Sequence, residues 1–416
     1  MEQSEHSVLR NNLRWNNIHG IMSVLSMNMV APFTGLFAIR LGASDAQIAA
    51  LSSWPALAGL LSMIPGARLT DSRDKKKQLV AFFQLFNRSF FLLLALLPFL
   101  VTDTFARPAV FVVLIALMNV PGAVANVSWQ SFIGGVIPSE RRAQAFATRN
   151  QLMAVCGAAA TLIAGRVMNM LAFPVGFQIM FATGFALALL ERYALLKIEE
   201  PETQSRKIRP RLGGWQQFRA GLADNPQYWH FGLASLVFHF GWQMAWPLFT
   251  KFQIQELGAT AVWVSIFSVC STIGATIAYP LWAKWVNKKG NKFMLIFAAL
   301  GLAATPLFYA ASTELWMLAV WSLIMGFSIA GISLILFNTL LEVSPEDNRT
   351  SFIAYHNTAA NASAVVSPYV GIFFVGLVGI RGALVVASGL RLLGAACFAL
   401  LYILESRQHR RQAGPV

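Results

Sequence analysis

The chain has 416 residues, of which 56% are hydrophobic and only 12% are charged, and its formal net charge is +14. A soluble domain carries about 25% charged residues, so this composition excludes an ordinary soluble protein and indicates a membrane protein. The three cysteines fall inside apolar runs and form neither a disulfide framework nor a metal-binding spacing.

Twelve apolar runs of about 20 residues or more follow one another, each long enough to cross about 30 Å of hydrocarbon. We predict transmembrane helices near 16–39, 46–66, 78–101, 108–137, 143–165, 173–196, 226–250, 260–283, 291–311, 315–343, 349–376 and 382–404. The predicted fold is an all-α polytopic membrane protein of twelve transmembrane helices.

The longest polar stretch, residues 199–225, divides the twelve runs six and six. We therefore predict an N-terminal six-helix lobe at 1–198, a cytoplasmic linker at 199–225 and a C-terminal six-helix lobe at 226–416.

Basic residues concentrate after the second run, in the linker and after the eighth run. Placing both termini in the cytoplasm puts these segments on the cytoplasmic side, as the positive-inside rule requires. The positive charge therefore indicates topology and not nucleic-acid binding. It predicts a multi-pass protein of a bacterial cytoplasmic membrane.

The two halves of the sequence resemble each other. A Leu-Gly-Ala triplet at 41–43 recurs 216 residues later, at 257–259. A basic turn follows each triplet, with Asp71 and Lys76 in the first copy and Asn287 and Lys292 in the second. Two similar halves in the same order predict two pseudo-symmetric lobes.

A second turn recurs before the fifth run, at 138–142, and before the eleventh, at 345–349. Its charged side chains, Glu140 and Arg142 in one copy and Asp347 and Arg349 in the other, can bridge helix ends. They belong either to contacts that form and break as the protein changes conformation, which would make them a gate, or to ordinary helix caps.

Twelve helices in two halves, with a basic turn after the second helix of each, resemble the major facilitator superfamily. Its turn reads Gly-x-x-x-Asp-Arg-x-Gly-Arg-Lys. The first copy here has Ala67 for the leading Gly and keeps Asp71, whereas the second has Asn287 for Asp and keeps Gly290 and Lys292. The resemblance covers the whole chain. It implies rocker-switch alternating access about a site near the membrane midplane, between the lobes.

Two motifs typical of the superfamily's proton-coupled drug antiporters are missing. The fourth run reads Asn119-Val120-Pro121-Gly122 where those proteins carry an Arg before Gln-Gly, and the fifth run has no Gly-Pro pair at 153–158. These departures argue against drug–proton antiport.

The resemblance implies that the first, fourth, seventh and tenth helices line the cavity. Polar side chains within hydrocarbon must face the protein interior or a wet cavity. The alternative role is packing, in which an interhelical hydrogen bond contributes about 0.6 kcal/mol. The two tryptophans either stack on a substrate or fill the lobe interface. The candidates on shared faces are Asn28 (with Asn17), Asn126 and Gln130 (with Asn119), His239, Trp242, Gln243, Trp246 and Asn338.

Arg149 and His356 occupy equivalent positions in the fifth and eleventh runs, and Asn357 follows His356. This positive pair suits an anionic substrate, so we add these three residues to the substrate-binding candidates. The alternative for Arg149 is snorkelling to the membrane surface. Arg88 and Arg391 are expected to serve structural pairing or snorkelling.

We predict a secondary transporter that moves a small organic solute, anionic or sugar-like, by alternating access. It is either facilitative or coupled to a proton or sodium ion, and His239, His356 or Glu342 would carry a proton. The alternatives are a multidrug or metabolite efflux carrier, a lipid flippase, and a non-transporting scaffold or sensor. We expect no enzyme activity, cofactor or metal. The expected partners are the solute, the coupling ion and the lipid bilayer, with the protein a monomer.

Overall fold

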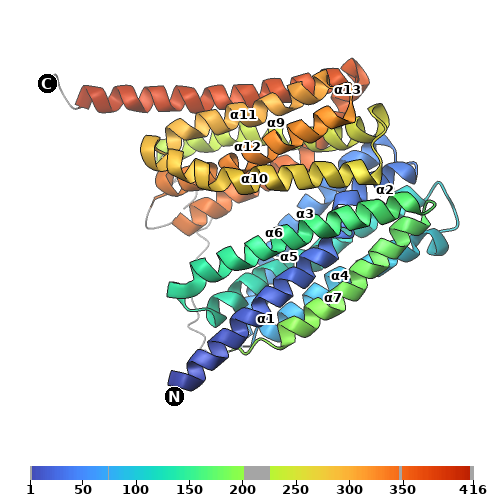
Figure 1. Cartoon of the computed structure of the whole chain (residues 1–416). Helices are drawn as coiled ribbons and strands as arrows, with labels where there is room; N and C mark the ends of the chain where they lie inside the picture. Colours follow the sequence, from blue (N-terminus) through green and yellow to red (C-terminus); the bar gives the residue numbers. More distant parts are fainter. Residues whose placement is uncertain (1, 74, 201–224, 346–348, 413–416) are drawn as a thin grey trace. The chain divides into compact units, whose positions relative to one another are not determined.

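The structure is a computed structural model that describes residues 2–73, 75–200, 225–345 and 349–412 (Figure 1). In these ranges the chain is helical almost throughout and contains no β-strand. Most of the predicted linker, residues 201–224, lies outside the described residues, as does Asp347; the side chains of Glu140 and Arg349 are likewise not described.

The first half supplies the helices that frame the candidate site described below. They are α1 (Glu2–Asn28), the 3₁₀ turn η1 (Ala31–Phe33), α2 (Thr34–Arg40), α3 (Asp45–Asp71), α4 (Lys77–Leu100), α5 (Arg107–Val136), α6 (Ser139–Met170) and α7 (Val175–Leu196).

The second half repeats this order of helices. It consists of α9 (Pro226–Lys251), the π-helical turn η2 (Phe252–Glu256), α10 (Ala261–Lys289), α11 (Asn291–Ala311), α12 (Leu315–Val343) and α13 (Arg349–Gln412).

Within the described ranges, 10 helical segments are long and apolar enough to cross a membrane. Helix α9 is not among them, although its 26 residues suffice in length. Helix α13 counts once, yet its 64 residues are interrupted by non-helical backbone at Gly379 (φ 72°, ψ 173°). Counting α9 and the two arms of α13 separately gives the twelve predicted helices and confirms the predicted all-α membrane fold.

The backbone conformation explains why a Leu-Gly-Ala triplet stands at the same place in both halves. Gly42 and Gly258 have φ values of 88° and 67°, in the left-handed region that favours glycine. Gly42 follows the end of α2, where the Ala43 N–H donates to Ala38 O at 3.0 Å, and Gly258 follows the end of η2. Each triplet is therefore a helix stop of the type that glycine permits.

The chain divides into two compact units, residues 1–208 with 259–269, and residues 209–258 with 270–416. The first unit includes the start of α10. In the first unit α1 packs on α6 and α7, and α4 packs on α5 and α7. In the second, α13 packs on α9 and α11.

Two glycines set the approach of α10 and α12 in the second unit. A Cβ atom on Gly326 of α12 would overlap the backbone of Ser271, and a Cβ on Gly274 of α10 would overlap that of Leu323. The Trp282 indole N–H also donates to Phe327 O at 3.0 Å between these helices. Small residues at both positions allow this close helix contact, as is common between membrane helices.

Arg391, in the second arm of α13, is fully buried and joins α9 to α11. Its guanidinium donates to the carbonyls of Gly241 (3.1 Å) and Trp242 (3.0 Å), and to Leu302 O (2.8 Å). Leu302 O precedes Pro306 by four residues, and proline has no N–H to complete that helical bond. Arg391 supplies the missing donor, so its structural role agrees with the sequence prediction.

Candidate substrate site

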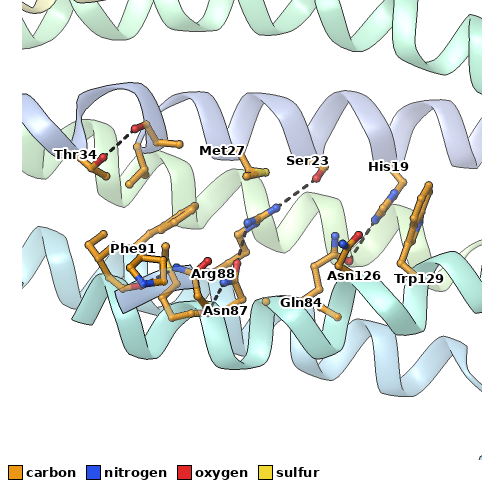
Figure 2. Close-up of a pocket in the computed structure, with 18 of the residues that line it drawn as sticks. His19, Ser23, Met27, Thr34, Gln84, Asn87, Arg88, Phe91, Asn126 and Trp129 are labelled. Carbon is orange, nitrogen blue, oxygen red and sulfur yellow. Dashed lines mark hydrogen bonds between the residues drawn. The ribbon is translucent and has the colours of Figure 1, made fainter. Parts of the chain in front are cut away.

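A cavity of about 570 Å³ lies within the first unit (Figure 2). Its walls come from α1 to α6. Helix α4, which is not among the expected cavity helices, contributes Gln84, Asn87 and Arg88. The polar and aromatic lining consists of His19, Ser23, Thr34, Gln84, Asn87, Arg88, Phe91, Asn119, Asn126, Trp129 and Arg149.

Arg88 of α4 is held by an ion pair beside this cavity. Its Nε atom lies 3.2 Å from Oε2 of Glu191 on α7, and the Glu191 residue is fully buried. The other guanidinium nitrogens donate to Asn87 Oδ1 (2.8 Å) and to Ser23 Oγ (3.3 Å), the latter drawn in Figure 2. A buried charge with several polar partners is fixed in position, and here the pair is neutral as a whole.

Arg149 of α6 also lines the cavity, but its partners are neutral. Its Nε donates to Asn16 O at 3.3 Å, and its guanidinium carbon lies 4.5 Å from the centre of the Trp129 ring. Gly20 of α1 leaves the space that the side chain occupies, since a Cβ there would come within 2.7 Å of Nε. No carboxylate among the described residues forms an ion pair with Arg149.

A chain of hydrogen bonds links the two arginines. Arg149 Nη2 lies 3.5 Å from His19 Nδ1, and His19 Nε2 lies 3.2 Å from Gln84 Oε1, as Figure 2 shows for the second contact. The Gln84 amide in turn donates to Glu191 Oε1. A single neutral tautomer of His19, protonated on Nε2, satisfies every donor and acceptor in this chain.

The charges around the cavity do not balance. Arg88 and Glu191 cancel, whereas Arg149 adds one positive charge that no described carboxylate neutralises. Within a membrane such a charge calls for a counter-ion. The cavity is therefore suited to a ligand that carries a negative charge.

Of the substrate-binding candidates in the first half, some lie at the cavity and one makes a packing contact between helices. Arg149 and Asn126 line the cavity, and Gln130, which is exposed, donates to Asn126 Oδ1 at 3.4 Å. Asn28 instead donates to Gly157 O at 2.9 Å on α6, which corresponds to the packing alternative.

In the second unit, three candidates gather around Ser235. Its Oγ lies 2.8 Å from His356 Nε2 and 3.2 Å from His239 Nδ1, and the His239 ring lies 5.7 Å from that of Trp242. The other candidates are dispersed. Gln243 donates to Ala360 O, Asn338 donates to Asn291 Oδ1, and Trp246 and Asn357 are exposed.

The predicted gating residues that the structure describes lie at helix ends. Arg142 donates to Gly134 O (2.8 Å) and Ile137 O (3.2 Å) at the end of α5, as a helix cap does. Lys76 binds Ser131 Oγ at 2.7 Å, and Lys292 pairs with Glu405 at 2.6 Å. Asp71 and Asn287 are exposed.

Sequence reasoning missed the group that links the arginines. Gln84, His19 and Glu191 are not among the residues that the sequence patterns indicate. The available signal was the pairing rule for buried charges: Glu191 is a lone carboxylate in an apolar helix, and Arg88 is a lone cation in another.

Comparison with known proteins identifies the family. Residues 18–231 and 231–415 match the family model described as Major Facilitator Superfamily. The chain belongs to the major facilitator superfamily. This assignment confirms the family and the two-lobe fold class predicted from the sequence, and it supports the transporter interpretation.

Curated relatives within this superfamily match only part of the chain. The multidrug resistance proteins MdtG of Proteus mirabilis and Serratia proteamaculans are 24% and 23% identical over 147 and 165 residues. These matches cover 34% and 38% of this chain and 36% and 39% of those proteins. The class H tetracycline resistance protein of Pasteurella multocida is 30% identical over 92 residues, 22% of this chain and 23% of that protein. The chain thus spans less than two fifths of each relative's length.

Solved structures of the superfamily match nearly the whole fold. The nucleoside transporter NupG aligns with a TM-score of 0.72 at 13% identity, over 94% of this chain and 99% of that one. A D-xylose–proton symporter aligns with a TM-score of 0.67 at 15% identity, over 94% and 97%. At these identities the likeness concerns the fold.

Proposed function

We propose that the protein is a secondary transporter that moves a small anionic organic solute by rocker-switch alternating access. The cavity of the first unit binds the solute, and the Arg149 guanidinium binds the negatively charged group of the solute. The observation that carries this proposal is a buried guanidinium that faces the cavity with only neutral partners. Arginine suits this role because its planar fork matches a carboxylate or phosphate bidentately.

The residues around the cavity refine the solute class. Trp129 offers an aromatic face, and Asn126 and Gln84 offer amide donors and acceptors. A solute with one anionic group and a small planar or polar body satisfies this set. In the second unit we propose His239, Trp242 and His356, which gather around Ser235, as further substrate-binding residues, with Asn338 and Asn357 as additional candidates.

The experiment is a thermal-shift screen of the purified protein in detergent. The panel contains small monocarboxylates, sulfonates and phosphate monoesters, each beside its neutral amide or alcohol analogue. Anionic members should raise the melting temperature and their neutral analogues should not. A panel in which neutral analogues stabilise equally contradicts the anionic class.

Efflux of drugs is the second candidate function, favoured by the MdtG and tetracycline resistance relatives. Tetracycline and a cationic dye belong in the same screen. Stabilisation by these compounds and not by the anions would favour efflux.

We propose that both termini lie in the cytoplasm of a bacterial cell, in the cytoplasmic membrane, and that the protein acts as a monomer. A cysteine introduced at Ser205 in a cysteine-free background tests the orientation. A membrane-impermeant maleimide should label it in inside-out vesicles and not in intact cells; labelling in intact cells contradicts the topology.

Asp71 tests the proposed gate at the basic turn. Removing its carboxylate should slow the conformational change, so Asp71→Ala should lower uptake of the best anionic probe by about tenfold or more, or about 1.4 kcal/mol in the barrier. Surface expression, measured on the same cells, should change far less. Unchanged uptake would remove Asp71 from the mechanism.

A further inference from the structure

We propose that Glu191 is the proton-binding group of this transporter, and that it couples proton movement to the anionic solute as symport. The proposal rests on the proposed function, in which Arg149 binds the anion. It replaces the histidines favoured by sequence reasoning with a carboxylate that only the folded chain reveals as buried and connected.

The first step is the position of Glu191 itself. It is the one buried carboxylate among the described residues, and it lies on the membrane-spanning helix α7. It accepts hydrogen bonds from Arg88 and from Gln84, both of which line the cavity. A carboxylate inside a membrane helix is costly and marks a functional site unless it serves only to pair a cation.

The second step is a connection from Glu191 to the anion site. The bonds from Arg149 through His19 and Gln84 to Glu191 all run in one direction, each group donating to the next. Protonation of Glu191 weakens the hydrogen bond that its carboxylate accepts from Gln84, because a neutral acceptor binds less strongly than a charged one, and the change reaches Arg149 through His19. The chain thus places proton binding and solute binding within one hydrogen-bonded network.

The third step is a polar path along α1. Asn12, Asn16, His19 and Ser23 follow spacings of four, three and four, so they share one helix face, and all four are buried. Asn12 bonds the backbone of Glu199 just after α7, through donor and acceptor at 3.0 and 2.8 Å. The amide atoms of Asn16 have no protein partner, and buried amides of this kind bind water. The stripe provides a route between the linker end of α7 and His19.

The fourth step is electrostatic. The charged or titratable groups that face Glu191 are Arg88 from α4, His19 from α1 and Arg149 from α6; Arg166 of α6 is exposed and Arg142 binds the end of α5. With Glu191 ionised and His19 neutral, Arg88, Arg149 and Glu191 sum to one positive charge. With Glu191 protonated, they sum to two.

An anion therefore binds more tightly when Glu191 holds a proton, and by reciprocity the bound anion favours protonation. Proton and solute consequently load together. The proton leaves water on one side, is held as the carboxylic acid of Glu191, and returns to water on the other side, and no group is oxidised or reduced.

The test that needs no solute is infrared difference spectroscopy of the purified protein across a pH range. The carbonyl band of a protonated carboxylic acid should grow as pH falls, and Glu191→Gln should remove the part of it that belongs to a buried group. The matched control Glu405→Gln removes a carboxylate that is also ion-paired, to Lys292, and should leave this band intact. A band unchanged by Glu191→Gln overturns the proposal.

The second test measures affinity for the best anionic probe of the panel against pH. Wild-type affinity should rise as pH falls, whereas Glu191→Gln, which mimics the protonated acid, should bind tightly at every pH. If Glu191→Gln does not fold, Glu191→Asp keeps a carboxyl group and should retain the pH dependence with a shifted midpoint. Affinity that is independent of pH in the wild type overturns the proton site while leaving the anion site standing. A carboxylic-acid band that Glu191→Gln removes, together with no binding of any anionic probe, overturns the anion site and leaves the proton site standing.

Discussion

Arg149→Ala is expected to abolish binding of the anionic probe while the protein still folds. Arg149 is the cation of the cavity without a described carboxylate partner, so the solute is the group that would neutralise it. Truncating one member of a buried charge pair costs about 2–5 kcal/mol of binding, which lowers affinity roughly 30-fold or more. The fold should survive, because a buried guanidinium without a counter-ion contributes little to stability.

Two companion variants make this result specific. Arg149→Lys keeps the charge but loses the planar fork and its stacking on Trp129, so its affinity should lie between those of wild type and Arg149→Ala. Arg166→Ala removes an exposed arginine from the same helix and should bind the probe normally. Wild-type affinity in Arg149→Ala would identify the arginine as a snorkelling residue and would redirect the proposal toward a neutral or cationic solute.

Gly326→Ala is expected to produce the largest loss of stability. The added methyl group would overlap the backbone of Ser271, and main chain cannot move aside as a flexible side chain can. Helices α10 and α12 would have to separate, which also strains the Trp282 bond to Phe327 O. Overpacking typically costs about 1–3 kcal/mol, and a backbone clash belongs at the upper end of this range.

Thermal unfolding in detergent measures this effect. A thiol-reactive dye can follow it through Cys156, Cys270 and Cys397, which are partly buried. The matched control is Gly389→Ala, in an exposed part of α13 where a Cβ meets nothing within 4 Å. That variant should be neutral or gain up to about 1 kcal/mol, since alanine favours helix. Equal melting temperatures for the two variants would contradict the close helix contact.

The fold followed from the sequence because its signals are local. Apolar length determines which segments cross a membrane, and a glycine that must adopt positive φ marks the end of a helix in both halves. The repeated Leu-Gly-Ala triplets therefore mark equivalent helix ends in the two halves. The same reasoning gave Arg149 and Asn126, because polar groups within apolar runs need an interior surface.

The rest of the site depended on helix packing that no local pattern encodes. The first apolar run begins near residue 16, but α1 begins at Glu2, and its residue Asn12 is already buried. Asn12 and Asn16 therefore lie outside or at the edge of the predicted span. The predicted face, with Asn17 and Asn28, differs from the face that carries His19 and Ser23, which bond to Gln84 and Arg88 of α4. The sequence shows Glu191 and Arg88 as charges within apolar runs, but only the packing of α4 against α7 shows that they pair with each other.

Arg391 has an evolutionary consequence for the second lobe. Its acceptors on α9 are main-chain carbonyls of Gly241 and Trp242, which every residue type provides. Substitutions at the exposed positions of α9 therefore leave this anchor intact. Under the proposed function, side chains of α9 that bind the solute can change one at a time while Arg391 still holds the helix in place. Altered specificity should thus arise more readily on α9 than on α1, whose polar side chains are themselves the connections.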